Sequence, residues 1–147
     1  MKIKQITVEE LFAQEQGLFD KYSEEAKVAQ APITAPSIDY YLSLEAKGSL
    51  TCTGLYIDNK LKGFCLIVYF YMAHSGTIGG SIDAIYVDSC SRNYGSGKQL
   101  ISQAEAYAKE VGAKILTMTA PMNSRLAKVA KSFGYEATNI IHSKALV

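Results

Sequence analysis

The sequence feature that most restricts the fold is a strand that leads through a glycine-rich turn into a helix and then into another strand. An extended apolar run ends at Val87, a loop follows, and a helix is expected over residues 96–111. Gly112 ends that helix, and residues 114–120 are predicted to form a short strand. The helix assignment depends on apolar residues that recur on one face, namely Leu100, Ile101, Ala104, Ala108 and Val111. Such a β-α-β connection predicts two parallel strands joined by a right-handed crossover.

Two further extended segments precede the strand that ends at Val87, and the three strands together predict an antiparallel meander. Residues 50–57 and 62–72 are rich in β-branched and aromatic side chains, and residues 58–60 between them signal a turn. The two runs therefore predict a long hairpin, and residues 76–87 predict a third strand. A meander followed by a parallel crossover implies an α/β fold with a mixed sheet and helices on both faces.

The two ends of the chain supply the remaining elements. Thr7 and Glu10 have the spacing of a capping box at the start of a helix, and Pro32 and Pro36 interrupt helical periodicity. The remaining predicted elements are a strand over 2–6, helices over 8–29, 37–48 and 124–133, and one or two strands within 135–146. We expect one domain over residues 1–147, because the length falls within the usual range for a domain.

Composition excludes several classes of protein. The chain has 48% hydrophobic and 20% charged residues with a formal net charge of +1, so its overall charge attracts neither nucleic acid nor an anionic membrane. The longest apolar run, residues 64–73, is half the ~20 residues that a membrane-spanning helix needs. The first residues form no secretory signal, and three cysteines without close spacing predict reduced thiols and no zinc site. These features together predict a cytoplasmic protein that needs no metal.

The turn before the expected helix is suited to an anion. Gly95, Ser96 and Gly97 let the backbone approach a ligand, and amide hydrogens at a helix N-terminus favour negative charge. A P-loop is excluded because Arg92 and Gln99 stand where that motif needs glycine and serine or threonine. The dinucleotide fingerprint fails because its third glycine would fall at Leu100. A phosphate or pyrophosphate cradle and a turn without any ligand both fit these residues.

Four short motifs then carry a resemblance to a known family. Arg92-x-x-Gly95-x-Gly97 resembles the acyl-CoA signature of the GNAT superfamily of N-acetyltransferases. The motifs Ile85-Tyr86-Val87-Asp88, Asn123-Ser124-Arg125 and Phe133-Gly134-Tyr135 resemble the end of its fourth strand and two later segments of that superfamily. The resemblance covers about residues 82–135 and implies the acyl-CoA N-acyltransferase fold. That fold has a mostly antiparallel central sheet, a parallel pair of strands that splay apart, and helices on both faces.

The resemblance implies a site for acetyl-CoA. The main chain of Ile85, Tyr86 and Val87 would pair with the pantetheine arm in the gap between the splayed strands. Asn123 would lie near the pantetheine and the thioester. The amides that would hold the pyrophosphate, together with the side chain of Lys98, belong to Arg92, Asn93, Tyr94, Gly95, Ser96 and Gly97.

The same resemblance implies direct attack of an amine on the thioester. Asp83 matches the position of a base-like glutamate in some members, and strand alternation predicts that it shares a face with Ile85 and Val87. The usual tyrosine beside the CoA sulfur is replaced by Ala130, which carries no hydroxyl. Cys90 has no nearby histidine in the sequence, so an acyl-enzyme role for it is not expected.

The sequence says less about where the amine acceptor binds than about where acetyl-CoA binds. Four tyrosines, which also fit a packing role, are candidates to line an acceptor pocket: Tyr40, Tyr41, Tyr69 and Tyr71. Two functions stay open: an N-acetyltransferase for an unidentified amine of a small molecule or protein, and a non-catalytic acyl-CoA-binding or structural protein with the same fold. Homodimers are common in the superfamily and are compatible with either function.

Overall fold

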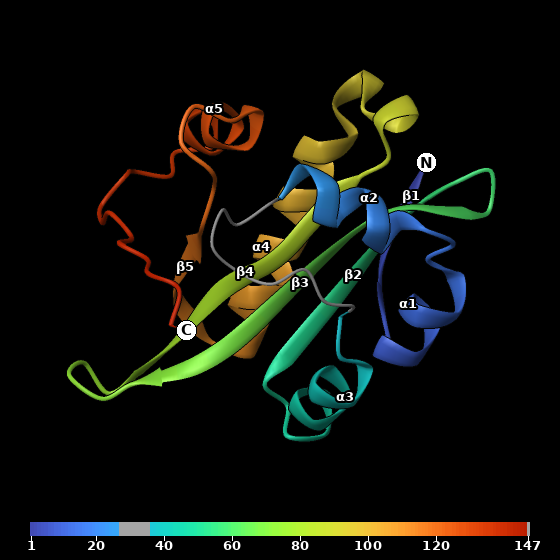
Figure 1. Ribbon diagram of the computed structural model, residues 1–147. Helices are drawn as coiled ribbons and strands as arrows, with labels where there is room; N and C mark the ends of the chain where they lie inside the picture. Colours follow the sequence, from blue (N-terminus) through green and yellow to red (C-terminus); the bar gives the residue numbers. More distant parts are fainter. Residues whose placement is uncertain (27–35, 147) are drawn as a thin grey trace.

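The protein, described by a computed structural model over residues 1–26 and 36–146, is built on a five-stranded sheet in sequential order. The strands are β1 (Lys2–Ile6), β2 (Leu50–Ile57), β3 (Lys60–Met72), β4 (Thr77–Val87) and β5 (Ala113–Met118). Neighbouring strands from β1 to β4 are antiparallel, and β4 and β5 are parallel. This confirms the α/β mixed sheet with one parallel pair that the sequence predicts (Figure 1).

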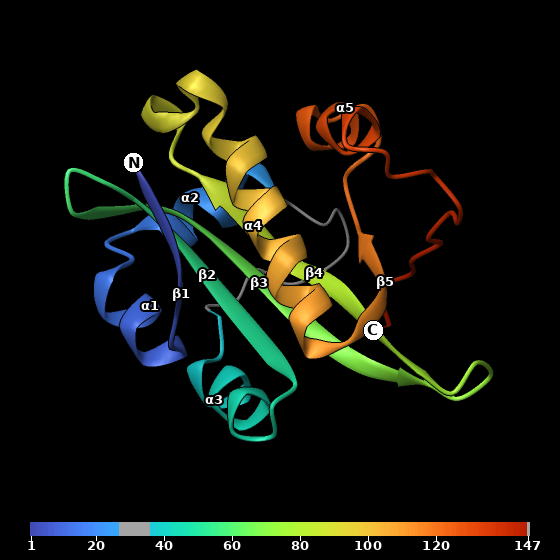
Figure 2. The same cartoon turned by 180° about the vertical axis from the view of Figure 1, so that it is seen from behind.

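Helices cover both faces of the sheet. Three short helices, α1 (Val8–Gln14), α2 (Leu18–Glu25) and α3 (Ile38–Ala46), lie on the face toward the viewer in Figure 1. The sixteen-residue helix α4 (Ser96–Val111) crosses the opposite face, as Figure 2 shows. We call these the α1–α3 face and the α4 face. Each has its own core: Phe64, Leu66 and Tyr86 are buried on the first, and Ile67, Ile82 and Leu100 on the second.

Local signals in the sequence fix several element boundaries. Thr7 and Glu10 form the predicted capping box at the start of α1, and the Ser37 side chain caps α3. Asp58 and Asn59 both adopt positive φ angles in the turn between β2 and β3, which suits a tight hairpin. Gly112 ends α4 with a φ of 102°.

The single helix expected over residues 8–29 is wrong, because the chain breaks it into α1 and α2. Gln16 and Gly17 have φ angles of 43° and 85°, which no α-helix accommodates. The break redirects the chain so that Leu18 and Phe19 become buried on the α1–α3 face. Tertiary burial therefore overrides helical periodicity here. The last residues of that expected helix, and Pro32, lie outside the described residues.

The strands expected within residues 135–146 are also not observed. After α5 (Arg125–Ser132), the described chain to residue 146 forms neither strand nor helix, and Ile140 and Ile141 are largely exposed. Strand propensity becomes structure only where a neighbouring strand provides hydrogen bonds and a surface to pack on. This segment, drawn in red in Figure 1, adds no strand beside β5. Within the described residues, no helix is both long and apolar enough to cross a membrane.

Candidate functional site

The site begins where the two parallel strands stop pairing. The β4–β5 register runs from Ile78–Ala113 to Ile82–Met118. Strand β4 continues to Val87, so its residues 83–87 extend past the last β5 partner found in the described chain. Among the described residues, no β5 partner therefore pairs with the stretch of β4 where the resemblance implies a pantetheine arm.

An irregularity in β4 lies at the same point. On the β3 side, Leu66 pairs with Ala84 and Ile67 pairs with Ile82, so Asp83 is the extra residue of a β-bulge. Because a bulge interrupts strand alternation, Ile82 packs on the α4 face while Ala84 packs on the α1–α3 face. Splayed strands and a bulge thus coincide at Asp83.

The bulge overturns one expectation about Asp83. Alternation predicted that it shares a face with Ile85 and Val87, but those two pack with the α4 core. The Asp83 carboxylate instead accepts a hydrogen bond from the Tyr41 hydroxyl of α3, with 2.7 Å between Oδ2 and the phenol oxygen. Its backbone carbonyl accepts a longer bond, 3.4 Å, from the Tyr22 hydroxyl. Asp83 therefore faces the α1–α3 side.

The two tyrosines that hold Asp83 remain hydrogen-bond donors over the physiological pH range. Burial, the hydrogen bond to Asp83 and the negative charge of Asp83 raise the pKa of the Tyr41 phenol well above its usual value. Burial, and then the Asp83 charge, also raise the pKa of Tyr22. Both phenols thus stay protonated, and Tyr41 fixes one carboxylate oxygen while the other has no protein partner among the described residues.

The glycine-rich turn has the form that an anion site needs. Two short 3-10 helices, η1 (Ser89–Ser91) and η2 (Asn93–Gly95), lead into α4. Gly95 precedes the helix with a φ of 73°, and a Cβ added at Gly95 or at Gly97 would meet nothing within 4 Å. The buried Ser96 hydroxyl donates to the Ser91 carbonyl and ties the turn together. The open turn leaves the first amides of a long helix accessible to a ligand.

The side chain of Arg92 holds the turn in place. Its Nε donates to the Val87 carbonyl at 2.8 Å, and its Nη2 lies 2.7 and 2.8 Å from the two Glu25 carboxylate oxygens of α2. The guanidinium also lies over the Tyr86 ring, 5.2 Å from its centre. The guanidinium thus ties the loop to β4 and α2, and its contacts are made within the protein.

The other residues predicted to bind the donor are spread around this turn. Asn93 is exposed in η2, the backbone of Tyr94 follows it there, and Lys98 is exposed on the first turn of α4. Lys98 lines a depression with Met1 and Ile3, on the β1 side of the helix. Asn123 is exposed, with a φ of 60°, immediately before Ser124, which caps α5.

Ala130 occupies the position where the resemblance to the superfamily implies a tyrosine. Ala130 is half-buried on α5 and has no group that can transfer a proton. Tyr135 follows α5, and its hydroxyl donates to Glu105 Oε1 of α4 at 2.9 Å. Burial and that carboxylate raise the pKa of Tyr135, so its proton is held more tightly than in a free phenol.

Sequence reasoning missed a charged cluster next to the turn. The Asp88 carboxylate is nearly buried and lies 3.3 Å from Lys21 Nζ and 3.8 Å from Lys62 Nζ. Burial alone raises the pKa of Asp88, but hydrogen bonds from Lys21 and Cys90 and the lysine charges outweigh it and lower the pKa overall. These groups lie far apart in the chain and follow no motif, so no local signal reveals the cluster.

The four candidate tyrosines do not gather in one pocket. Tyr41 contacts Asp83, and the neighbouring Tyr40 is largely exposed. Tyr69 packs on the α4 face, where its hydroxyl is 2.7 Å from Thr51 Oγ1. Tyr71 is exposed near the tip of the β3–β4 hairpin. Strand alternation separates the last two from Asp83, which leaves Tyr41 as the candidate that reaches the site.

The cysteine thiols differ in exposure. Cys52 and Cys65 are buried, and burial raises the pKa of Cys65 to about 12, so it is unreactive. Cys90 is exposed, and its Sγ lies 3.5 Å from Asp88 Oδ2. Across residues 1–26 and 36–146, no three His, Cys, Asp or Glu side chains are grouped to hold a metal ion.

Comparison with known proteins decides the family. The sequence model of the Acetyltransferase (GNAT) family matches residues 11–135, which is most of the chain. The chain belongs to this family. No curated protein matches the sequence of this family member. Its assignment is therefore made by the family model and is consistent with the splayed strands and the open turn.

Solved structures share the fold of this GNAT chain at low sequence identity. A ribosomal-protein-alanine N-acetyltransferase from Brucella melitensis biovar Abortus 2308 is 20% identical with a TM-score of 0.76, over 99% of this chain and 100% of that one. An aminoglycoside acetyltransferase from an uncultured soil metagenomic sample, in complex with sisomicin, is 19% identical with a TM-score of 0.79, over 99% and 95%. A probable acetyltransferase is 22% identical with a TM-score of 0.76, over 100% and 97%. At these identities the likeness establishes the fold.

Proposed function

We propose that this GNAT protein transfers an acetyl group from acetyl-CoA to an amine of a small molecule or a protein. The observation that carries the proposal is the coincidence of three features at one end of β4. The strand edge opens beyond Ile82, the turn at Gly95–Gly97 presents accessible amides, and Asp83 projects at the bulge between them. Residues 83–97 thus contain candidate groups to bind the pantetheine arm, to hold the negatively charged pyrophosphate and to remove a proton from the amine.

The donor part of the proposal uses mainly backbone groups. Amides at the start of α4 would hold the pyrophosphate, and the exposed edge of residues 83–87 would pair with the pantetheine amides. The Val87 carbonyl already accepts a hydrogen bond from Arg92, and its second lone pair stays available. Asn123, at the start of α5, is the candidate to approach the thioester from the β5 side.

The chemistry requires removal of one proton from the amine. The nitrogen lone pair forms the C–N bond, the C–S bond breaks, and CoA leaves as a thiolate that solvent can protonate. Asp83 takes the proton from nitrogen directly or through a water molecule. The Tyr41 hydroxyl holds Oδ2 of that carboxylate, so the other oxygen is oriented for this task.

A second function is favoured by one observation. Ala130 leaves no hydroxyl where the family usually places one, and the Tyr135 proton is held by Glu105. A thiolate is a good leaving group, so this absence reduces the catalytic machinery without removing it. A protein that binds acyl-CoA without transferring the acyl group is therefore the alternative.

Calorimetric titration with acetyl-CoA and with free CoA tests the donor site first. Binding, accompanied by a stabilisation of ~2.7 kcal/mol at one hundred times the dissociation constant, supports it. Chromatographic measurement of CoA formed in the presence of amines then separates the two functions. We recommend chromatography because the exposed Cys90 would react with a thiol reagent. A folded protein that binds neither ligand would refute both functions.

A further inference from the structure

The α1–α3 face of the sheet carries, beyond Asp83, a strip that none of the described helices covers. Helices α1, α2 and α3 leave the lower part of β4 and all of β5 free on this face (Figure 1). The register places Phe70 opposite Gly79, and pairs Gly79 with Ile115 and Ser81 with Thr117. We call this set, with Asp83 at its upper end, the acceptor strip: Phe70, Gly79, Ser81, Asp83, Ile115 and Thr117.

Packing of the glycines shows which face the strip occupies. A Cβ at Gly80 would contact Ile67, Tyr69 and Leu116, which belong to the α4 core. A Cβ at Gly79 would lie only 2.7 Å from the Phe70 ring, so the absence of a side chain lets that ring lie against the strand. Gly79 and Phe70 therefore lie on the opposite face, the one toward which Asp83 points.

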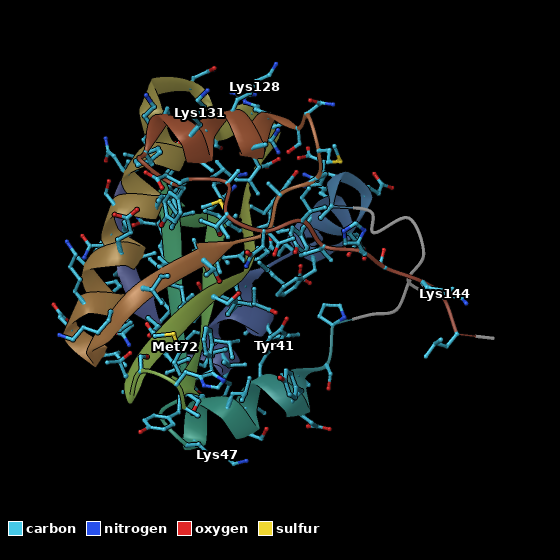
Figure 3. The ribbon with its side chains drawn as sticks, turned by 90° about the vertical axis from the view of Figure 1, so that its left-hand side faces the viewer. Tyr41, Lys47, Met72, Lys128, Lys131 and Lys144 are labelled. Carbon is cyan, nitrogen blue, oxygen red and sulfur yellow. The ribbon has the colours of Figure 1, made fainter. Side chains whose placement is uncertain are left out.

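The strip combines exposed apolar surface with one charge. Phe70 is 41% exposed and Ile115 is 50% exposed, although both are large apolar side chains on a sheet. Asp83 is the charged member of the strip, and the rest are apolar, small or hydroxyl-bearing. Figure 3 shows Tyr41 pointing from α3 toward the sheet, whereas Lys128 and Lys131 lie on α5 at the other end of the view.

The dimensions of the strip define a ligand. Gly79 and Asp83 are four positions apart along the strand, which is roughly 13 Å between their Cα atoms. A ligand with one ammonium group at Asp83 and an apolar body several carbons long would cover Phe70 and Ile115. A second ammonium group on that body would find no second carboxylate in the strip, and against the aliphatic side chain of Ile115 it would lose part of its hydration.

We propose that the acceptor is a small primary monoamine with an apolar or aromatic body, bound along this strip. The inference rests on the proposed acetyl transfer, and it adds the class of acceptor. Asp83 attracts the ammonium group and then takes its proton, while Phe70 and Ile115 bind the body. Polyamines and other polycations are poor acceptors, because the strip offers a single carboxylate.

Matched amines test the charge argument with the intact chain. Hexylamine is compared with hexamethylenediamine, which adds one ammonium group to the same carbon chain, and phenylbutylamine is compared with spermidine. CoA formation is measured by chromatography at a fixed, saturating concentration of acetyl-CoA. We expect kcat/KM to be at least tenfold higher for each monoamine than for its polycationic partner. Equal or higher values for the polycations overturn the proposal.

Two neighbouring aromatic residues of β3 provide a matched pair of variants. Phe70→Ala should raise KM for phenylbutylamine about tenfold, with little change in kcat. Tyr71→Ala is the control, because Tyr71 is 70% exposed and strand alternation places it on the other face. Equal effects of the two substitutions overturn the assignment of the strip. Calorimetry with acetyl-CoA should give the same affinity for both variants and the wild type.

The donor titration separates failure of this inference from failure of the proposed function. If acetyl-CoA binds and the polycations yield CoA while neither monoamine does, the acceptor class is wrong and the proposed acetyl transfer stands. If acetyl-CoA binds and none of the four amines yields CoA, this inference is overturned and the alternative of acyl-CoA binding without transfer is favoured. If acetyl-CoA does not bind to the folded protein, the proposed acetyl transfer itself is wrong.

Discussion

Replacing Gly97 by glutamate should separate stability from ligand binding. Gly97 lies in the first turn of α4, and a Cβ built there meets no atom within 4 Å. The substitution therefore creates no clash, and it relieves the entropic cost of glycine in a helix, which is about 0.5–1 kcal/mol. A carboxylate near a helix N-terminus adds about 0.3–1 kcal/mol through the helix dipole. The folded state should gain about 1–2 kcal/mol in total.

The same carboxylate should weaken CoA binding. If it lies about 4 Å from a phosphate charge, the repulsion is about 1 kcal/mol in water and about 4 kcal/mol at the intermediate dielectric of a protein surface. These energies correspond to a loss of affinity between about fivefold and a thousandfold. Thermal unfolding should therefore shift upward by roughly 2–8 °C while the CoA dissociation constant rises.

Gly97→Gln is the control, because glutamine has nearly the same size as glutamate and no charge. Calorimetry with CoA should show a much smaller loss of affinity for this variant than for Gly97→Glu. Equal losses for the two variants would mean that bulk, and not charge, blocks the site. Wild-type affinity in Gly97→Glu would refute the placement of the pyrophosphate at this turn.

Three other substitutions test separate parts of the structure. Gly95→Ala should destabilise the protein by roughly 1–2 kcal/mol in urea unfolding, because Gly95 has a φ of 73°; an unchanged midpoint would contradict that backbone conformation. Asp83→Asn should lower turnover at neutral pH by about a hundredfold or more with unaltered affinity for CoA, and full turnover would remove Asp83 as the base. Asp88→Asn should cost about 1–2 kcal/mol of stability at pH 7, because it removes the charge that Lys21 and Lys62 surround. Because the folded-state pKa of Asp88 is lowered, that contribution is complete above its usual value of ~3.9 and disappears as the pH falls through the folded-state pKa. The wild type and Asp88→Asn should therefore converge in stability in acid, and a constant difference across this range would contradict the linkage.

The elements that the sequence predicted correctly have signals contained within a few residues. The capping box of Thr7 and Glu10, the turn at residues 58–60 and the periodic face of α4 are local, so each could be found without a partner segment. The order of these elements also predicted the antiparallel meander and the parallel crossover, because short connections restrict how strands can pair.

The wrong predictions concern segments whose structure depends on a distant partner. Residues 8–29 have helical periodicity, but the break at Gln16 and Gly17 is set by burial of Leu18 and Phe19. Residues 135–146 have strand propensity, but the described chain offers them no pairing. Propensity alone decides neither case, because its contribution is small compared with that of packing.

For the site, the sequence by itself predicted a turn suited to an anion, because Gly95, Ser96 and Gly97 form a short continuous stretch of backbone at the start of a helix. Only the tertiary structure decided the direction of Asp83. One extra residue between the partners of Leu66 and Ile67 turned its carboxylate away from Ile85 and toward Tyr41 of α3. The physical reason is that strand alternation has a period of two, so a single bulge reverses the face of a side chain, and pairing with β3 places that bulge.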